Sequence, residues 1–226
     1  MKNIVLLLAS GIGSRCGLDY PKQFAAINGK TILEYSIDVF ENHNLIDEII
    51  IVTNPEYKNK VQELTKSYKK VSCVIEGGKE RKDSSYNGIS VIQDNEANVL
   101  IHDAVRPLIS ENIITDCINS LASYNAVCAA IPSTDTIFLI DDEDNIISIP
   151  KRKMLRRAQT PQCFKLSVIK EAHLKARKDV NCSVTDDCGL IMNYTNEKIH
   201  IIEGDINNIK TTYPEDIEFF KSKVLK

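Results

Sequence analysis

No part of the sequence approaches the ~20 consecutive apolar residues that a membrane-spanning helix requires. The apolar run within Met1 to Ala9 has the length of a buried strand, and it falls short of the apolar region and cleavage site of a secretory signal. We therefore expect a cytoplasmic protein that has no membrane partner.

An excess of positive charge is also missing. The 28 Lys and Arg residues face 31 Asp and Glu residues, and the formal net charge is −3. A protein that binds nucleic acid regardless of its sequence usually carries a basic excess, so no nucleic-acid partner is expected. Overall charge says little about a single cleft, however, and local basic clusters can still bind a phosphorylated small molecule.

The seven cysteines lack CxxC spacing and are odd in number. This pattern argues against a disulfide framework and against a zinc site, and it is typical of reduced thiols in the cytoplasm. We predict no metal-ligating side chains.

Two common nucleotide-binding motifs are absent as well. In the glycine-rich segment 9–17, Cys16 occupies the place of the third glycine of G-x-G-x-x-G. The glycine-rich segment contains no G-K-[ST], and Gly29-Lys30-Thr31 has Phe24 in place of the first glycine of G-x-x-x-x-G-K-[ST], which excludes a Walker A loop. None of the four histidines pairs with a plausible Ser or Cys nucleophile motif, and His102 is predicted to be a structural residue at the end of a strand.

What the sequence does contain is a regular alternation of β-rich apolar runs with amphipathic stretches. Its 226 residues and 43% hydrophobic content suit a single α/β domain over residues 1–226. Strands are expected at 4–8, 48–52, 71–75, 99–102, 126–131 and 198–202, and helices at 31–40, 55–68, 82–92, 111–123, 166–176, 186–192 and from Pro214 onward. This alternation predicts a Rossmann-like, mostly parallel sheet flanked by helices.

The pattern changes over residues 133–157. Two apolar runs, 136–140 and 146–149, flank the polar segment 141–145 and predict a β-arm that protrudes from the domain. A basic run, 151–157, follows the arm. Because an apolar arm that projects from a domain has to bury its surface, we expect a homodimer formed through it.

Charged residues follow several predicted strands. They lie in segments 77–84, 102–107 and 208–212, which come directly after strands, and the glycine-rich segment follows the first strand. The carboxyl ends of parallel strands meet at one edge of the sheet, where ligands bind. The cations expected to converge there, in a cleft suited to a triphosphate and a phosphorylated acceptor, are Arg15, Lys22, Arg81, Arg106 and Lys210. Asp103 adds one carboxylate, suited to a hydroxyl group or to a metal ion.

Short motifs occur in a specific order along nearly the whole chain. They are Ala9-Ser10-Gly11-Ile12-Gly13-Ser14-Arg15, Tyr20-Pro21-Lys22-Gln23-Phe24, the segments 77–84 and 102–107, Arg157-Ala158-Gln159-Thr160-Pro161-Gln162, Thr185-Asp186 and Asn208-Ile209-Lys210. Together they resemble the CTP-dependent sugar-alcohol-phosphate cytidylyltransferases. That group includes the 2-C-methylerythritol 4-phosphate enzyme of isoprenoid synthesis and the ribitol 5-phosphate enzyme of teichoic-acid and capsule synthesis.

The resemblance implies a nucleotide site. The residues that would wrap CTP or face its cytosine and ribose are Ala9, Ser10, Gly11, Gly13, Gly78, Arg81 and Ser84. Arg15 and Lys22 would be the catalytic residues, because they would hold the phosphates and stabilise the transition state. Ser10 is a departure from the smaller residue usual at this position of the loop, and its hydroxyl can alter the nucleotide contacts.

The resemblance also implies an acceptor site. The residues that would face the polyol phosphate are Asp103, Arg106, Thr160, Thr185 and Lys210, with Arg152 lent by the partner subunit's arm. The acceptor phosphate has a second pKa of ~6, so it is mostly dianionic near pH 7 and needs no general base to attack the α-phosphorus of CTP. Mg²⁺, bound chiefly through the CTP phosphates, is the expected cofactor and would ease the departure of pyrophosphate.

Two acceptors remain open. Segments 102–107 and 17–24 look more like the ribitol phosphate branch, and Arg156 stands where the methylerythritol branch usually has a tryptophan. Segment 157–160 leans toward the methylerythritol branch, where alanine replaces the other branch's glycine. We predict D-ribitol 5-phosphate, with 2-C-methyl-D-erythritol 4-phosphate as the alternative.

Two other classes of function fit the sequence less well. A non-catalytic module that binds CTP would have no need of both Arg15 and Lys22 beside the phosphates. An NAD-dependent reductase is disfavoured because the dinucleotide fingerprint is absent. We expect a nucleotidyltransferase that makes a CDP-polyol and pyrophosphate.

Overall fold

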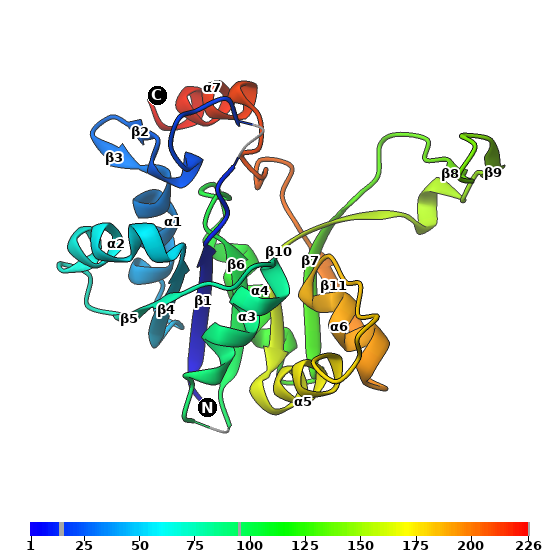
Figure 1. The fold of residues 1–226 in the computed structure, drawn as a ribbon, viewed down its shortest axis with the longest axis horizontal. Helices are drawn as coiled ribbons and strands as arrows, with labels where there is room; N and C mark the ends of the chain where they lie inside the picture. Colours follow the sequence, from blue (N-terminus) through cyan, green and yellow to red (C-terminus); the bar gives the residue numbers. More distant parts are fainter. Residues whose placement is uncertain (14–15, 95, 226) are drawn as a thin grey trace.

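A seven-stranded sheet forms the centre of the computed structural model, which describes residues 1–13, 16–94 and 96–225 (Figure 1). Its strands, in their spatial order, are β11 (Ile199–Glu203), β7 (Ala126–Pro132), β10 (Arg156–Lys165), β6 (Asn98–Asp103), β1 (Asn3–Ala9), β4 (Glu48–Thr53) and β5 (Val71–Glu76). β10 is antiparallel to β6 and β7, whereas the other neighbours in the sheet are parallel. The predicted α/β class and mostly parallel, Rossmann-like sheet are confirmed.

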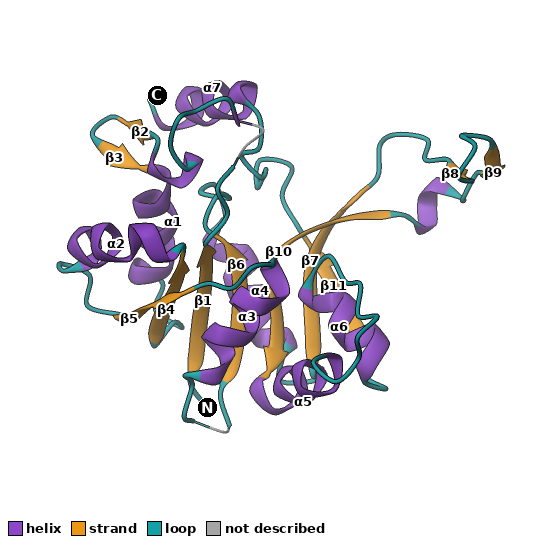
Figure 2. Cartoon of the chain, in the orientation of Figure 1, coloured by secondary structure: helices purple, strands orange, loops and turns teal. Residues whose placement is uncertain are grey.

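Helices cover both faces of the sheet (Figure 2). Their bounds are α1 (Ile32–Asn42), α2 (Lys58–Thr65), α3 (Arg81–Ser90), α4 (Glu111–Ser120), α5 (Leu166–Ala176), α6 (Asp187–Tyr194) and α7 (Pro214–Val224). α1, α2 and α4 pack on one face, and α3, α5 and α6 on the other. Among the described residues, no helix combines the length and the apolar character that crossing a membrane would require.

Local sequence signals explain where several helices begin. The Thr31 hydroxyl accepts a hydrogen bond from the backbone N–H of Glu34, and the Glu34 carboxylate accepts one from the backbone N–H of Thr31, so α1 begins with a capping box. The Asp186 side chain caps α6 by accepting from the N–H of Gly189. The helix predicted over 55–68 is instead a 3-10 turn (Pro55–Tyr57) followed by the shorter α2.

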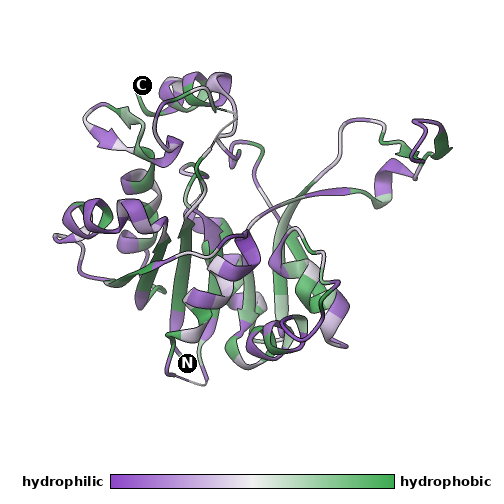
Figure 3. Ribbon diagram, in the orientation of Figure 1, coloured by the Kyte–Doolittle hydropathy of each residue, from purple (hydrophilic) through white to green (hydrophobic). Residues whose placement is uncertain are grey.

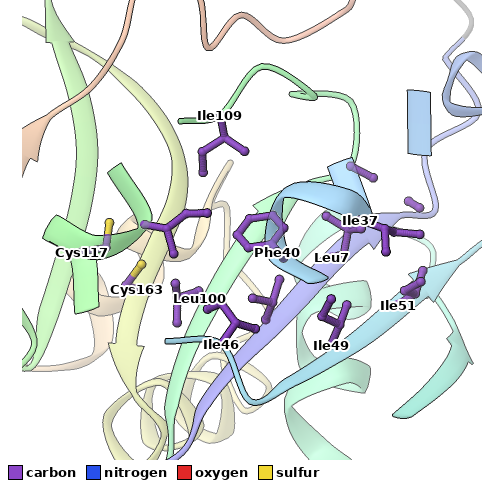
Figure 4. Packing of buried hydrophobic residues seen from close by; sticks show 14 of the residues in the cluster. Leu7, Ile37, Phe40, Ile46, Ile49, Ile51, Leu100, Ile109, Cys117 and Cys163 are labelled. Atoms are coloured by element: carbon purple, nitrogen blue, oxygen red, sulfur yellow. The ribbon is translucent and has the colours of Figure 1, made fainter. Parts of the chain in front are cut away.

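Two apolar layers, one on each face of the sheet, form most of the core, and a smaller apolar cluster lies beneath α7. Along β1, Leu7 packs into one layer and Leu6 into the other, as the two-residue period of a strand requires. Apolar strands therefore run through the middle of the molecule (Figure 3). Figure 4 shows Leu7 packed with Ile37 and Phe40 of α1. A rigid core of this kind holds the strand ends in fixed positions.

The predicted arm protrudes from the domain, as Figure 2 shows for β8 and β9. β8 (Leu139–Ile140) and β9 (Ile146–Ser148) are shorter than the predicted runs and pair antiparallel. Asp141 closes the turn between them by accepting hydrogen bonds from the backbone N–H groups of Glu143 and Asn145. The large apolar side chains exposed on the arm are Ile137, Phe138, Leu139, Ile140, Ile146, Ile147 and Ile149.

One central element was not predicted. β10 occupies residues that the sequence presents as part of a basic run and a polar motif containing Pro161. Proline in an apparent strand argues against a central position, because it cannot donate to the ladder. The structure accommodates Pro161 at an irregularity: the pairing register with β7 shifts between Ala158 and Gln162. Two short strands, β2 (Ala26–Ile27) and β3 (Lys30–Thr31), were not predicted either.

Candidate active site

A cavity of about 310 Å³ opens at the carboxyl ends of β1 and β6. These ends lie at the upper edge of the sheet in Figure 1. The cavity is lined by Leu8, Ala9, Ser10, Gly11, Ile12, Gly13, Lys22, Gln23, Gly78, Lys79, Glu80, Arg81, Asp103, Val105 and Lys210. The cavity therefore lies at the carboxyl ends of the strands, where ligands bind in proteins with an open parallel sheet.

The glycine-rich loop after β1 is held in place by Gln23. Its side-chain amide donates to the carbonyl oxygens of Ala9, at 2.6 Å, and Gly11, at 3.0 Å. Gly13 has a φ of +72°, and a Cβ there would lie 3.1 Å from Cγ of Lys22. A glycine thus lets the loop pass close to Lys22, which lines the cavity and is 7% exposed. Arg15, the other predicted catalytic residue, lies outside the described residues.

Asp103, at the end of β6, is the carboxylate around which the cations of the site gather. Its oxygens lie 2.8 Å from Nζ of Lys210, 3.3 Å from Nε of Arg81 and 3.9 Å from Nε of Arg106. Burial raises the pKa of Asp103, but the three cations outweigh this effect and hold the pKa well below its usual range. Asp103 is therefore ionised whenever the site is folded near neutral pH.

Arg81 joins this cluster to a second carboxylate. Its Nη1 lies 2.6 Å from Oδ2 of Asp187, which has no exposed surface. Burial lowers the pKa of Arg81, but Asp187 and Asp103 together raise it above its ordinary value. The Ser85 hydroxyl donates to the other oxygen of Asp187 at 2.5 Å. Arg81 is consequently a fixed positive charge that a ligand phosphate or hydroxyl can meet.

Thr160 and His102 form a buried support beneath Asp103. The Thr160 hydroxyl accepts from the backbone N–H of Asp103 at 3.1 Å, and it lies 3.0 Å from Nδ1 of His102. Nε2 of His102 donates to the carbonyl oxygen of Arg106 at 3.1 Å, in the tautomer that lets Nδ1 accept from Thr160. Burial lowers the pKa of His102 to about 4, so the imidazole is neutral. His102 thus occupies the structural position at a strand end that the sequence predicts.

The segment that carries Lys210 is tied to the same support. Arg106 donates through Nη1 to the carbonyl oxygen of Asn208 at 2.7 Å. The Asn208 amide in turn donates to the carbonyl oxygen of Thr160 at 2.9 Å. The side chain of Arg106 does not line the cavity, so in this chain it braces the Lys210 segment beside Asp103.

Besides Arg106, four of the predicted site residues that the structure describes do not line the cavity. Thr185 is exposed in the segment before α6, and Thr160 is buried beneath Asp103. Arg152 is exposed at the base of the arm, where it donates to the carbonyl oxygen of Thr134 at 3.2 Å. Ser84 is also absent from the lining, and its hydroxyl oxygen lies 2.9 Å from that of Ser10. The other predicted residues, apart from Arg15 and Arg106, line the cavity as expected.

Sequence reasoning missed Asp187, Gln23 and Gln159. Asp187 is the second acid of an Asp-Asp pair at the start of α6, and an acid at a helix start is ordinarily explained by capping. Gln159 and Gln23 both act by holding backbone segments of the site: Gln159 donates to the carbonyl oxygen of Asp205 at 2.7 Å. The predicted motifs contain Gln23 and Gln159, but a glutamine has no charge pattern that marks such a role.

The donors in the cavity fit a magnesium ion that arrives with a nucleotide. The carboxylates that line the cavity are those of Asp103 and Glu80. In the described part of the chain, no group of three or more His, Cys, Asp or Glu side chains is arranged so that it could hold a metal ion. Mg²⁺ is usually held by substrate phosphates and one or two carboxylates, without a dedicated protein cage. The site fits that arrangement.

Comparisons with known proteins agree with this geometry. A family model described as 2-C-methyl-D-erythritol 4-phosphate cytidylyltransferase matches residues 3–223. A bifunctional ribulose 5-phosphate reductase/CDP-ribitol pyrophosphorylase from Haemophilus influenzae is 43% identical over 222 residues, which are 96% of this chain and 47% of that protein. The chain thus spans about half the length of that relative. A 2-C-methyl-D-erythritol 4-phosphate cytidylyltransferase from Lachnospira eligens is 41% identical over 220 residues, 96% of each chain.

The fold has a close counterpart among solved structures. The crystal structure of 4-diphosphocytidyl-2C-methyl-D-erythritol synthase from Anaerococcus prevotii matches with a TM-score of 0.88 at 29% identity, over 100% of this chain and 99% of that one. Sequence and fold therefore agree, and this chain belongs to the 2-C-methyl-D-erythritol 4-phosphate cytidylyltransferase family of nucleotidyltransferases.

Proposed function

We propose that this protein joins CTP to D-ribitol 5-phosphate, giving CDP-ribitol and pyrophosphate in the cytoplasm. The observation that carries cytidylyl transfer is the cavity in which Lys22, Arg81 and Lys210 line one space with Asp103. Three cations in one cleft can pair with the phosphates of a nucleotide and with that of an acceptor. The same space beside a glycine-rich loop suits a nucleotide.

The chemistry requires positioning and charge neutralisation. A phosphate oxygen of the acceptor attacks the α-phosphorus of CTP in line, one oxygen–phosphorus bond forms, and the bond to the leaving pyrophosphate breaks. The attacking dianion carries no proton on that oxygen near pH 7, because its second pKa is ~6. Negative charge grows on the α-phosphate, and Lys22 with Arg15 offsets it. Mg²⁺ held by the CTP phosphates supplies further neutralisation that favours departure of pyrophosphate.

Asp103 and Lys210 suit the acceptor. Nζ of Lys210 lies 2.8 Å from Oδ2 of Asp103, and the Lys210 side chain is 41% exposed. A phosphate entering the cavity can take Lys210 as its partner, while Asp103 keeps Arg81 and gains a hydroxyl donor of the polyol. Thr160 and Arg106 act on this site by fixing Asp103 and the Lys210 segment. Thr185 lies near the buried Asp187 in sequence and belongs to the acceptor side only by resemblance.

The choice of ribitol rests on two observations. The relative from Haemophilus influenzae, at 43% identity, is named for a CDP-ribitol activity. Arg156 is exposed at the start of β10, so the arm offers charge where an aromatic ring would cover a methyl group. The alternative is 2-C-methyl-D-erythritol 4-phosphate, the substrate named for the Lachnospira eligens relative and for the family model.

A homodimer is part of the proposal. The exposed apolar arm has no partner within its own chain among the described residues, and burying it against a second copy would remove that surface from water. Arg152, which lies at the base of the arm and does not line its own cavity, would act in the site of the neighbouring subunit.

Release of pyrophosphate tests the proposed chemistry. The protein with CTP, Mg²⁺ and D-ribitol 5-phosphate should release pyrophosphate, and leaving out either CTP or the acceptor should abolish release. A protein that binds CTP, as measured by calorimetry, yet releases none with either polyol phosphate would be a non-catalytic CTP-binding module.

A further inference from the structure

The cavity has an uncharged wall as well as a charged one. The small neutral groups come from Ser10, Gly11 and Gly78. The charged part is made by Lys22, Lys79, Glu80, Arg81, Asp103 and Lys210. Phosphates favour the cations, so a flat base is left to face the small neutral residues. Ser10 carries the only side-chain hydroxyl among the described residues that line the cavity.

The hydroxyl of Ser10 is 2.9 Å from the hydroxyl of Ser84, which is 1% exposed. Ser84 has further partners: it accepts from the backbone N–H of Gly78 at 3.1 Å and donates to the carbonyl oxygen of Glu80 at 3.2 Å. A serine hydroxyl has one proton to donate and two lone pairs to accept with. When Ser84 donates to Glu80 and accepts from Gly78, one lone pair of the Ser84 oxygen remains. The hydroxyl of Ser10 donates its hydrogen bond to this lone pair.

This count leaves Ser10 as an acceptor only. Its single proton is directed at Ser84, and no other residue that the structure describes bonds to its two lone pairs, which can accept from a group in the cavity. The opposite arrangement, with Ser84 donating to Ser10, removes the hydrogen bond to Glu80 and leaves the Ser10 proton without a protein partner. The first arrangement satisfies more donors and is the stable one.

The position of Ser10 is also fixed by packing. A Cβ on Gly77 would lie 2.6 Å from Cβ of Ser10 and 2.8 Å from Oγ of Ser84. The backbone N–H of Gly77 donates to the carbonyl oxygen of Thr53 at 2.7 Å, so this glycine is tied to the end of β4. The chain after β5 therefore presses against the Ser10–Ser84 pair, and the hydroxyl has little room to turn away.

We infer that Oγ of Ser10 accepts a hydrogen bond from the 4-amino group of cytosine and so makes the site prefer cytidine over uridine nucleotides. The inference rests on the proposed function, because it takes CTP as the nucleotide. Uracil presents an oxygen at the same ring position. To bind it, the Ser10–Ser84 pair must reverse and give up the hydrogen bond to Glu80, or two lone pairs must face each other.

The test is a double-mutant cycle in which the Ser10 hydroxyl and the 4-amino group of cytosine are removed singly and together. kcat/KM is measured for wild type and Ser10→Ala with CTP and with the triphosphate of the pyrimidin-2-one nucleoside, which lacks the 4-amino group. In wild type, removing the amino group should lower kcat/KM about five- to tenfold, the value of one hydrogen bond. In Ser10→Ala the two nucleotides should differ less than twofold. UTP should gain on CTP by a similar factor in the variant.

Two controls separate this role from general damage. Ser90→Ala removes an exposed hydroxyl of α3 that donates to the carbonyl oxygen of Tyr86, and it should leave all three nucleotides at wild-type kcat/KM. The melting temperature of Ser10→Ala should fall by only a few degrees, as expected for the loss of the one hydrogen bond to Ser84.

The outcomes distinguish the inference from the function beneath it. If CTP is turned over and Ser10→Ala lowers kcat/KM equally for CTP and for the analogue, the role of Ser10 is overturned and cytidylyl transfer stands. If wild type releases no pyrophosphate from CTP with either polyol phosphate, the proposed function fails and this inference falls with it.

Discussion

Nη1 of Arg81 lies 2.6 Å from Oδ2 of Asp187, a carboxylate with no exposed surface, while Nε of the same guanidinium lies 3.3 Å from Asp103 in the cavity. One arginine thus connects the first turn of α6 to the end of β6. Helix α6 is far in sequence from Arg81, yet its buried Asp187 fixes the position of the Arg81 guanidinium in the cavity.

Asp187→Asn should therefore impair both stability and substrate binding. The amide keeps an acceptor for Ser85 but leaves Arg81 with one carboxylate, and breaking a buried ion pair costs about 3–5 kcal/mol. We expect a loss of about 3 kcal/mol in the free energy of unfolding in urea, and a rise in the KM for CTP. The matched control is Asp179→Asn, an exposed carboxylate bonded to Tyr194, which should leave KM unchanged. An unchanged KM in Asp187→Asn would show that Asp103 alone positions Arg81.

Acid should destabilise the protein through His102. The ordinary pKa of 6.5 applies in the unfolded chain, and burial lowers the folded value to about 4. Between these pH values the unfolded chain binds more protons, so the free energy of unfolding falls as the pH falls from about 6.5 to about 4. A shift of this size corresponds to about 3 kcal/mol. Asp103, whose folded pKa is depressed, adds a further loss below pH ~4, the ordinary range of an Asp.

Urea unfolding at several pH values measures this effect. His102→Gln should be less stable than wild type at pH 7 but should lose less stability between pH 6.5 and 4. His173, whose pKa is also lowered by burial, accounts for part of the slope that remains. Equal slopes in the two proteins would mean that His102 is not buried as a neutral group.

Much of the fold was predictable because its signals are local. Each run of apolar residues that became β1, β4, β6 and β7 is short, β-rich and buried on both faces, as parallel strands are. The run that became β5 is β-rich too, but this strand lies at the edge of the sheet and is only partly buried. The arm was also predictable from local signals. Its two apolar runs have no helical periodicity, and the polar segment between them is typical of a turn between two strands. β10 was not, because Pro161 and several polar residues obscure the strand pattern, and its place between β6 and β7 is set by long-range pairing.

The candidate site was predictable where charge follows a strand. Lys22, Arg81, Asp103 and Lys210 line one cavity because the carboxyl ends of parallel strands meet at one edge. The contacts that support the site could not be predicted in the same way. Asp187 is far from Arg81 in sequence, and no local pattern connects the two residues. Thr160 and Arg106 were assigned to the acceptor, whereas the structure gives them hydrogen bonds that brace Asp103 and the Lys210 segment.

Lys22→Ala should lower turnover more than binding. Removing one preorganised charge beside the reacting phosphate lowers kcat by roughly 10²–10³, and Arg15→Ala should behave alike. The affinity for CTP should change less, because the other cations and the loop remain. Lys66→Ala, an exposed helix-end lysine paired with Glu63, is the matched control and should keep wild-type kcat. Near-normal kcat of Lys22→Ala with saturating CTP would remove Lys22 from the catalytic role.

Mixed dimers test whether Arg152 acts in the neighbouring site. Arg152→Ala and Lys22→Ala subunits, each inactive alone, should regain part of the activity when combined. In a mixed dimer one site carries both defects and the other carries neither. If mixed dimers are verified by mass spectrometry of differently tagged subunits and no activity returns, Arg152 does not act across the interface.

The central claim is that the acceptor is D-ribitol 5-phosphate, and its most direct measurement is kcat/KM for both polyol phosphates at saturating CTP and Mg²⁺. Hydrogen bonds to extra hydroxyls discriminate more strongly than the packing of one methyl group, which is worth only ~1–3 kcal/mol. We expect a higher kcat/KM for D-ribitol 5-phosphate, with CDP-ribitol and pyrophosphate formed in equal amounts. A clear preference for 2-C-methyl-D-erythritol 4-phosphate would contradict the choice of acceptor and leave the cytidylyl transfer itself intact.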